Sequence, residues 1–86
     1  MQTFNIYDEI KELCEQLEAS NFTKWSQTLK DAVISGSTGT EIFVEVKVTL
    51  DQLLREESSL SPNLKARAEA ILAFIHKNLK HFRFNS

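Results

Sequence analysis

The sequence predicts an all-α protein, an antiparallel four-helix bundle with helices at about residues 5–19, 24–35, 39–56 and 62–82. Apolar residues recur in each segment at intervals of three and four, which is the spacing of one face of an α-helix. The connections between the segments are short, as in a bundle whose neighbouring helices run antiparallel. A chain of 86 residues builds one core. Residues 1–86 are therefore expected to form a single helical domain.

The first segment begins at Asn5, whose side-chain oxygen suits a helix N-cap. Asp8 follows three residues later, near the positive end of the helix dipole. Cys14 is the only cysteine, so it forms no internal disulfide, and we expect it in the core rather than as a nucleophile. The apolar stripe of this segment consists of Ile6, Ile10, Leu13, Cys14 and Leu17.

The second segment follows the sequence SNFT, where the first pattern breaks. Thr23 is expected to cap it, and Gly36 stands where a helix commonly ends in a left-handed residue. Its apolar face is formed by Trp25, Leu29, Ala32 and Val33.

The loop GSTG that opens the third segment is rich in glycine and hydroxyl groups, as phosphate-binding loops are. A phosphate loop places a lysine after its last glycine, whereas here Gly39 is followed by Thr40 and Glu41. The carboxylate of Glu41 would repel a phosphate. Thr38 and Glu41 instead have the spacing of a capping box, so we interpret the loop as a helix start.

The third segment also fits an alternative. Val44, Val46 and Val48 alternate with polar residues, as in a half-buried strand, so an α+β fold with residues 42–50 as a strand is the alternative. We favour a helix because a lone strand would have no pairing partner in an otherwise helical chain. Helical spacing also relates Ile42, Val46, Leu50, Leu53 and Leu54.

The fourth segment starts at Ser61 and Pro62, because proline suits the first helical position. Basic residues fill its last turns, where the helix dipole favours them. Its apolar stripe consists of Leu64, Ala68, Ile71, Leu72, Ile75 and Leu79, widened by Phe74 and Phe82.

Catalytic, cofactor and metal sites find little support in the sequence. His76 and His81 lie five residues apart, on different faces of a helix, and neither they nor Cys14 has the spacing of a metal site. We expect a non-enzymatic protein without cofactor or metal. The N-terminus lacks the pattern of a signal peptide, and no apolar run approaches the roughly 20 residues of a membrane span, so a complete, cytoplasmic chain is expected.

Nucleic acid is an unfavoured partner, because the isoelectric point is about 5.6 and the first half of the chain is acidic. A protein partner is the better hypothesis. Asp8, Glu12 and Glu15 follow one another at offsets of four and three, with Glu9 beside them, and form an acidic face that suits the basic active site of a nuclease. Solubility is the competing explanation. Glu41 and Glu45 extend this face if segments 5–19 and 39–56 are neighbours.

Residues 22–54 carry a resemblance. Trp25 and Leu29, then SGSTGTEI opening an apolar segment that ends in LDQLL, make this region similar to short all-helical bacterial immunity proteins of toxin–immunity systems. The resemblance implies a tight-binding inhibitor of a cognate protein toxin, often a nuclease. The alternative is a generic helical interaction or regulatory module that self-associates through Phe74, Phe82 and Phe84; monomer and dimer both remain open.

Overall fold

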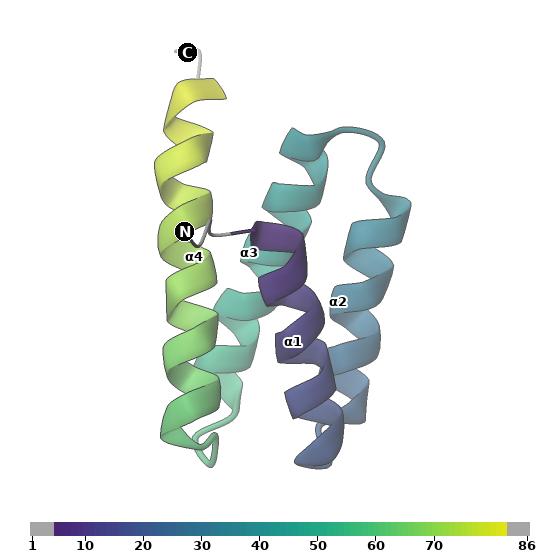
Figure 1. The fold of residues 1–86 in the computed structure, drawn as a ribbon, viewed down its shortest axis with the longest axis vertical. Coiled ribbons are helices and arrows are strands. Elements are labelled where there is room, and N and C mark those ends of the chain that lie inside the picture. The colour runs from purple at the N-terminus through teal and green to yellow at the C-terminus, as the bar shows by residue number, and fades with distance from the viewer. Residues whose placement is uncertain (1–4, 83–86) are drawn as a thin grey trace.

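The computed structural model describes residues 5–82. It contains four helices, α1 (Ile6–Ala19), α2 (Thr23–Ser35), α3 (Gly39–Glu56) and α4 (Pro62–Phe82), which run alternately up and down (Figure 1). The predicted four-helix bundle is confirmed, with helix ends within about a residue of those expected. Residues 42–50 lie within α3, so the alternative strand is wrong.

Each helix packs against two neighbours. α1 and α3 each pack against α2 and α4, and they face one another diagonally across the core (Figure 1). The condition under which Glu41 and Glu45 would extend the acidic face, that the first and third helices are neighbours, is therefore not met. This arrangement follows from the short connections, which place consecutive helices side by side and leave α4 to close the ring against α1.

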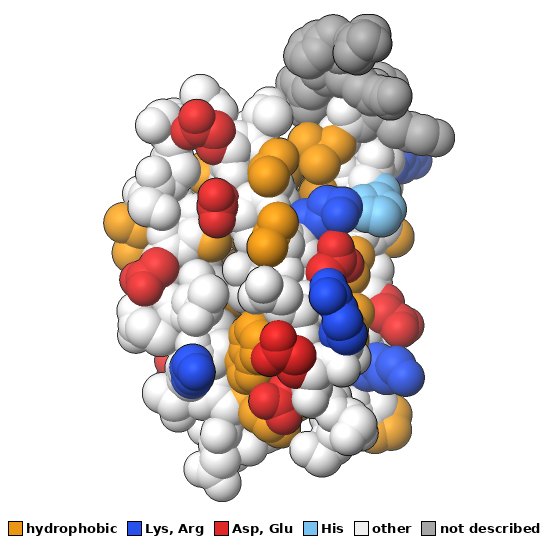
Figure 2. Space-filling model, turned by 180° about the vertical axis from the view of Figure 1, so that it is seen from behind, with side chains coloured by type: hydrophobic (Ala, Val, Ile, Leu, Met, Phe, Trp, Pro, Cys, Tyr) orange, Lys and Arg blue, Asp and Glu red, His pale blue; other side chains and the backbone are white. Residues whose placement is uncertain are grey.

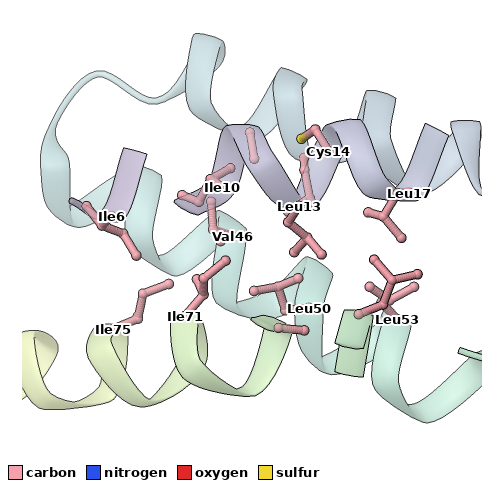
Figure 3. Close-up of a cluster of buried hydrophobic side chains, with 14 residues drawn as sticks. Ile6, Ile10, Leu13, Cys14, Leu17, Val46, Leu50, Leu53, Ile71 and Ile75 are labelled. Atoms are coloured by element: carbon pink, nitrogen blue, oxygen red, sulfur yellow. The ribbon is translucent and has the colours of Figure 1, made fainter. Parts of the chain in front are cut away.

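The core fills the space between the four helices. Buried side chains of α1 point toward those of α3 and α4 (Figure 3). Leu13, Leu17 and Leu50 are fully buried, and each such side chain contributes about 1.5–3 kcal/mol relative to an exposed one. Cys14 is also buried, as predicted, and its Sγ points toward α2, where it donates to the carbonyl oxygen of Ser26 at 3.7 Å.

α1 is capped at both ends. The Asn5 side chain accepts the N–H groups of Tyr7 at 3.0 Å and Asp8 at 3.2 Å, so the predicted N-cap is confirmed. At the other end Asn21 adopts the left-handed conformation, with φ of 71°, which asparagine tolerates better than most residues. The Phe22 N–H then donates to the carbonyl oxygen of Leu17 at 2.7 Å.

Two predictions about the ends of α2 are wrong. Thr23 is already the first helical residue, and the N-cap position falls on Phe22, which offers no side-chain acceptor. Gly36 has φ of −72° and ψ of 136°, which is extended rather than left-handed backbone. Its lack of a side chain has another reason, because a Cβ there would lie 2.4 Å from Cγ1 of Ile42.

The start of α3 confirms half of the capping box. Thr38 Oγ1 accepts the Glu41 N–H at 3.1 Å, as predicted. The Glu41 carboxylate reaches one residue further back than expected and accepts the N–H of Ser37 at 2.9 Å, instead of that of Thr38. α4 begins as predicted, with Ser61 Oγ accepting the Leu64 N–H at 3.2 Å.

The valines that suggested a strand occupy different sides of α3. Val46 is fully buried, whereas Val44 and Val48 are 42% and 47% exposed. Their alternation with charged residues coincides with a helical pattern in which only Val46 belongs to the core stripe. Tertiary packing of that stripe outweighs the modest helix propensity of valine.

Candidate partner-binding surface

The outward side of α1 carries the three carboxylates that the sequence places on one face. Asp8, Glu12 and Glu15 are all exposed, opposite the buried stripe of the same helix. α1 is anchored by its buried residues and capped at both ends, so the folded backbone fixes the spacing of these carboxylates. We call Asp8, Glu12 and Glu15 the acidic ridge.

Arg67 of α4 lies along one side of the acidic ridge. Its guanidinium donates to Glu9 Oε1 at 2.6 Å and lies 3.9 Å from Glu12 Oε1. Glu9 thus faces α4 and links two helices, whereas Glu12 is only partly compensated. The side chains of Asp8 and Glu15 have no hydrogen-bond or ion-pair partner among the residues whose side chains the structure describes. The ridge therefore keeps a net negative charge.

A polar network closes the other side of α1 against α2. Glu18 Oε2 accepts hydrogen bonds from Lys30 Nζ at 2.6 Å and from Ser26 Oγ at 2.7 Å. These two bonds, that of Lys30 first, lower the pKa of Glu18 below its usual 4.5, and the same contact raises the pKa of Lys30. Burial raises the pKa of the neighbouring Cys14 thiol, which therefore stays protonated at neutral pH.

A groove of about 420 Å³ lies between α1 and α2, next to the acidic ridge. Ile10 and Cys14 are buried at its floor, while Tyr7 and Ile34 are 45% and 79% exposed. Sequence reasoning missed this groove. The signal lay in Tyr7 and Ile34, which are large apolar residues outside the stripes assigned to their helices. The remaining lining residues are Lys11, Glu15, Glu18, Lys30 and Val33.

Glu41 and Glu45 do not join the acidic ridge, because α3 lies diagonally opposite α1. Both are exposed and line a separate hollow of about 470 Å³ at the connection between α2 and α3. The Glu41 carboxylate is occupied in capping its own helix. On the side of the molecule opposite to the view of Figure 1, carboxylates, cations and hydrophobic side chains are interspersed (Figure 2).

The aromatic residues expected to drive self-association are placed differently. Phe74 is half-buried and packs edge-on against Phe43, with ring centroids 6.1 Å apart and planes at 82°. It is not an exposed aromatic. Phe84 and the side chain of Phe82 lie outside the described part of the chain.

Among the described residues, no group of three or more His, Cys, Asp or Glu side chains is placed to hold a metal ion. His76 is exposed near the end of α4. Within residues 5–82 no helix combines the length and the apolar character that crossing a bilayer requires. The described surface offers contacts for binding, namely a fixed row of carboxylates and an adjoining apolar groove.

Comparison of the chain with protein-family models, with curated proteins and with solved structures finds no match.

Proposed function

We propose that the protein is a non-enzymatic inhibitor that binds a basic protein, a bacterial toxin domain of the nuclease type, and covers its active site with the outward face of α1. The observation that carries this proposal is the acidic ridge, three exposed carboxylates on a helix held rigid by its core and its caps. The residues 22–54 that resemble immunity proteins point to the same function.

Repulsion between the carboxylates of the acidic ridge costs the helix stability, although the helix dipole favours Asp8 in the first turn. Carboxylates three and four residues apart repel one another by a few tenths of a kcal/mol per pair. Arg67 compensates only one side, through Glu9 and more weakly through Glu12. The helix dipole favours Asp8 in the first turn of α1, but it does not account for Glu12 and Glu15 on the same face, whereas binding a cationic surface accounts for all three.

Electrostatic complementarity also gives an inhibitor a high association rate with its partner. An acidic face steers a basic partner into the correct encounter and raises the association rate above that of neutral surfaces. A nuclease active site is basic because it binds phosphate groups. A rigid row of carboxylates occupies the same positive surface without being cleaved, and this makes α1 suited to occlusion.

A protection assay tests this function. A toxin domain encoded beside this protein is produced in bacteria together with the wild-type protein or with the Asp8→Lys, Glu12→Lys, Glu15→Lys variant. We expect the wild type to restore growth and the variant to fail, although circular dichroism shows that the variant is helical. Equal protection by both proteins would show that inhibition does not depend on the acidic ridge. Failure of the wild type to protect would contradict the inhibitory function.

A further inference from the structure

We propose that the groove between α1 and α2 receives one apolar side chain of the partner, presented next to a lysine or arginine that pairs with Glu15. This inference rests on the proposed function and adds the chemistry of the segment that is recognised. The helices α1 and α2 are adjacent (Figure 1), and the residues that line the groove between them include Glu15 of the acidic ridge. One partner segment can therefore reach both features at once.

The apolar part of the groove is a contiguous surface and not a single exposed residue. Ile34 is 79% exposed and Tyr7 is 45% exposed, and both border the floor made by Ile10 and Cys14. Single exposed apolar residues are common, but apolar walls around a hollow are typical of an anchor site in an interface. The volume of about 420 Å³ is in the range of pockets that bind small-molecule ligands, so one side chain fits into it.

The charges that line the groove indicate which partner residue should lie next to the inserted apolar side chain. Glu18 and Lys30 pair with each other at 2.6 Å, so they neutralise one another. Lys11 and Glu15 also line the groove, and their opposite formal charges cancel. Glu15, however, belongs to the acidic ridge, where Asp8 and Glu12 add two further negative charges. A cation beside the inserted side chain is therefore favoured on the ridge side of the groove.

The same charges disfavour other occupants. In a twofold dimer through this face the same patch of both copies comes together, so six ridge carboxylates, three from each copy, would gather at one interface. Such an arrangement loses stability through repulsion between like charges. An anionic membrane or a nucleic acid would likewise be repelled by the acidic ridge. A basic protein segment is the occupant that the charges fit.

Peptide selection tests the proposal on the protein alone, before any partner is identified. A random peptide library displayed on phage is selected on the immobilised protein, and the enriched peptides are synthesised. We expect them to share a large apolar or aromatic residue next to lysine or arginine. Failure to enrich any peptide, or enrichment of peptides that lack this pair, would overturn the proposal.

Variants then locate the binding site. Ile34→Asp is expected to weaken peptide binding by at least about tenfold, because an anchor side chain loses its apolar wall. Val48→Asp is the matched control, since Val48 is 47% exposed on α3, and its affinity should stay within about twofold of the wild type. Tyr7→Ser serves as a second groove variant should Ile34→Asp fail to fold. Unchanged affinity in a folded groove variant, or equal loss in the control, would contradict the groove as the site.

Further measurements separate this inference from the function on which it rests. If neutralising the acidic ridge weakens peptide binding but Ile34→Asp does not, the groove is excluded and the ridge stands. Sedimentation of the wild type and of Ile34→Asp shows whether a second copy of the chain occupies the groove. A wild-type dimer that this substitution dissociates would overturn the proposal. Binding to phosphatidylglycerol vesicles that Ile34→Asp abolishes would overturn it as well.

Discussion

Gly36 shows how a single missing side chain lets two helices meet closely. Its backbone is extended and would accept any residue, yet an added Cβ would lie 2.4 Å from Ile42 Cγ1 and 3.1 Å from the Ile42 backbone nitrogen. We predict that Gly36→Ala lowers the free energy of unfolding by about 1–3 kcal/mol, because the first turn of α3 must move. Urea denaturation measures this change.

Gly39→Ala is the matched control. Apart from the adjacent residues and the backbone of its own helix, no atom lies within 4 Å of the added Cβ, and Gly39 is the first residue of α3, where alanine is the better helix former. The control should be neutral or stabilising. Equal destabilisation by the two substitutions would show that loop flexibility, and not the contact with Ile42, accounts for Gly36.

Glu18 gives the protein a predictable response to acid. Its pKa is lowered by the hydrogen bonds from Lys30 and Ser26, so the folded state binds this proton less tightly than the unfolded state does. The carboxylate therefore contributes stability above its ordinary pKa of 4.5, and this contribution is lost as the pH falls below that value through the lowered pKa.

We expect the urea midpoint of the wild type to fall between about pH 6 and about pH 3, and that of Glu18→Gln to fall less steeply. The glutamine carries no titrating proton but still offers an acceptor to Ser26 Oγ. Parallel pH profiles for the two proteins would mean that other carboxylates cause the acid response.

At the scale of the element, side-chain caps mark the starts of α1, α3 and α4. Thr38 accepts the Glu41 N–H at the start of α3, and we predict that Thr38→Ala lowers the free energy of unfolding by about 1 kcal/mol. Ser37→Ala is the control, because Ser37 contributes its backbone N–H to the cap and keeps it after the substitution. Thermal denaturation followed by circular dichroism compares the two variants, and equal melting temperatures would argue against the cap.

Helix positions could be predicted from the sequence because each depends on local signals. Asn5 caps α1 as expected, α4 starts at the predicted Ser61 and Pro62, and the apolar spacing identifies the buried faces. The failures have a physical cause. Gly36 is extended and lies close to Ile42 of the next helix, and the N-cap at Phe22 comes directly after the left-handed Asn21. Neither feature leaves a signal at the position itself.

At the scale of the whole molecule, helix arrangement determines which charges act together. The acidic ridge could be predicted because one helix carries it, whereas the separation of Glu41 and Glu45 depends on α1 and α3 being diagonal. The pair between Arg67 and Glu9 joins residues 58 positions apart, and no local pattern predicts it. The groove beside the ridge belongs to two helices, so the sequence of either helix alone does not reveal it.

A substitution of Arg67 tests whether the association rate depends on the charge next to the acidic ridge or on the net charge of the whole molecule. Arg67→Met takes the formal net charge from −2 to −3, since one positive charge is removed, and leaves Glu9 and Glu12 uncompensated beside the acidic ridge. We expect faster association with a basic toxin domain at low salt, by about two- to fivefold, and a stability loss of no more than about 1 kcal/mol.

Arg55→Met makes the same change of charge on α3, away from the ridge. Stopped-flow fluorescence should therefore show a smaller effect for this variant than for Arg67→Met. If both variants bind at the same rate, the net charge of the molecule governs association and the ridge has no special role.

The most direct test of the account is the affinity for the cognate toxin domain as a function of salt. The Asp8→Asn, Glu12→Gln, Glu15→Gln variant is compared with Asp31→Asn, Glu45→Gln, Glu56→Gln, which loses three exposed carboxylates from α2 and α3. We predict that the ridge variant binds at least about a hundredfold more weakly, with a flatter salt dependence, while the second variant stays within a few-fold of the wild type. Equal losses in the two variants, or none in the ridge variant, would contradict the claim that α1 is the binding face.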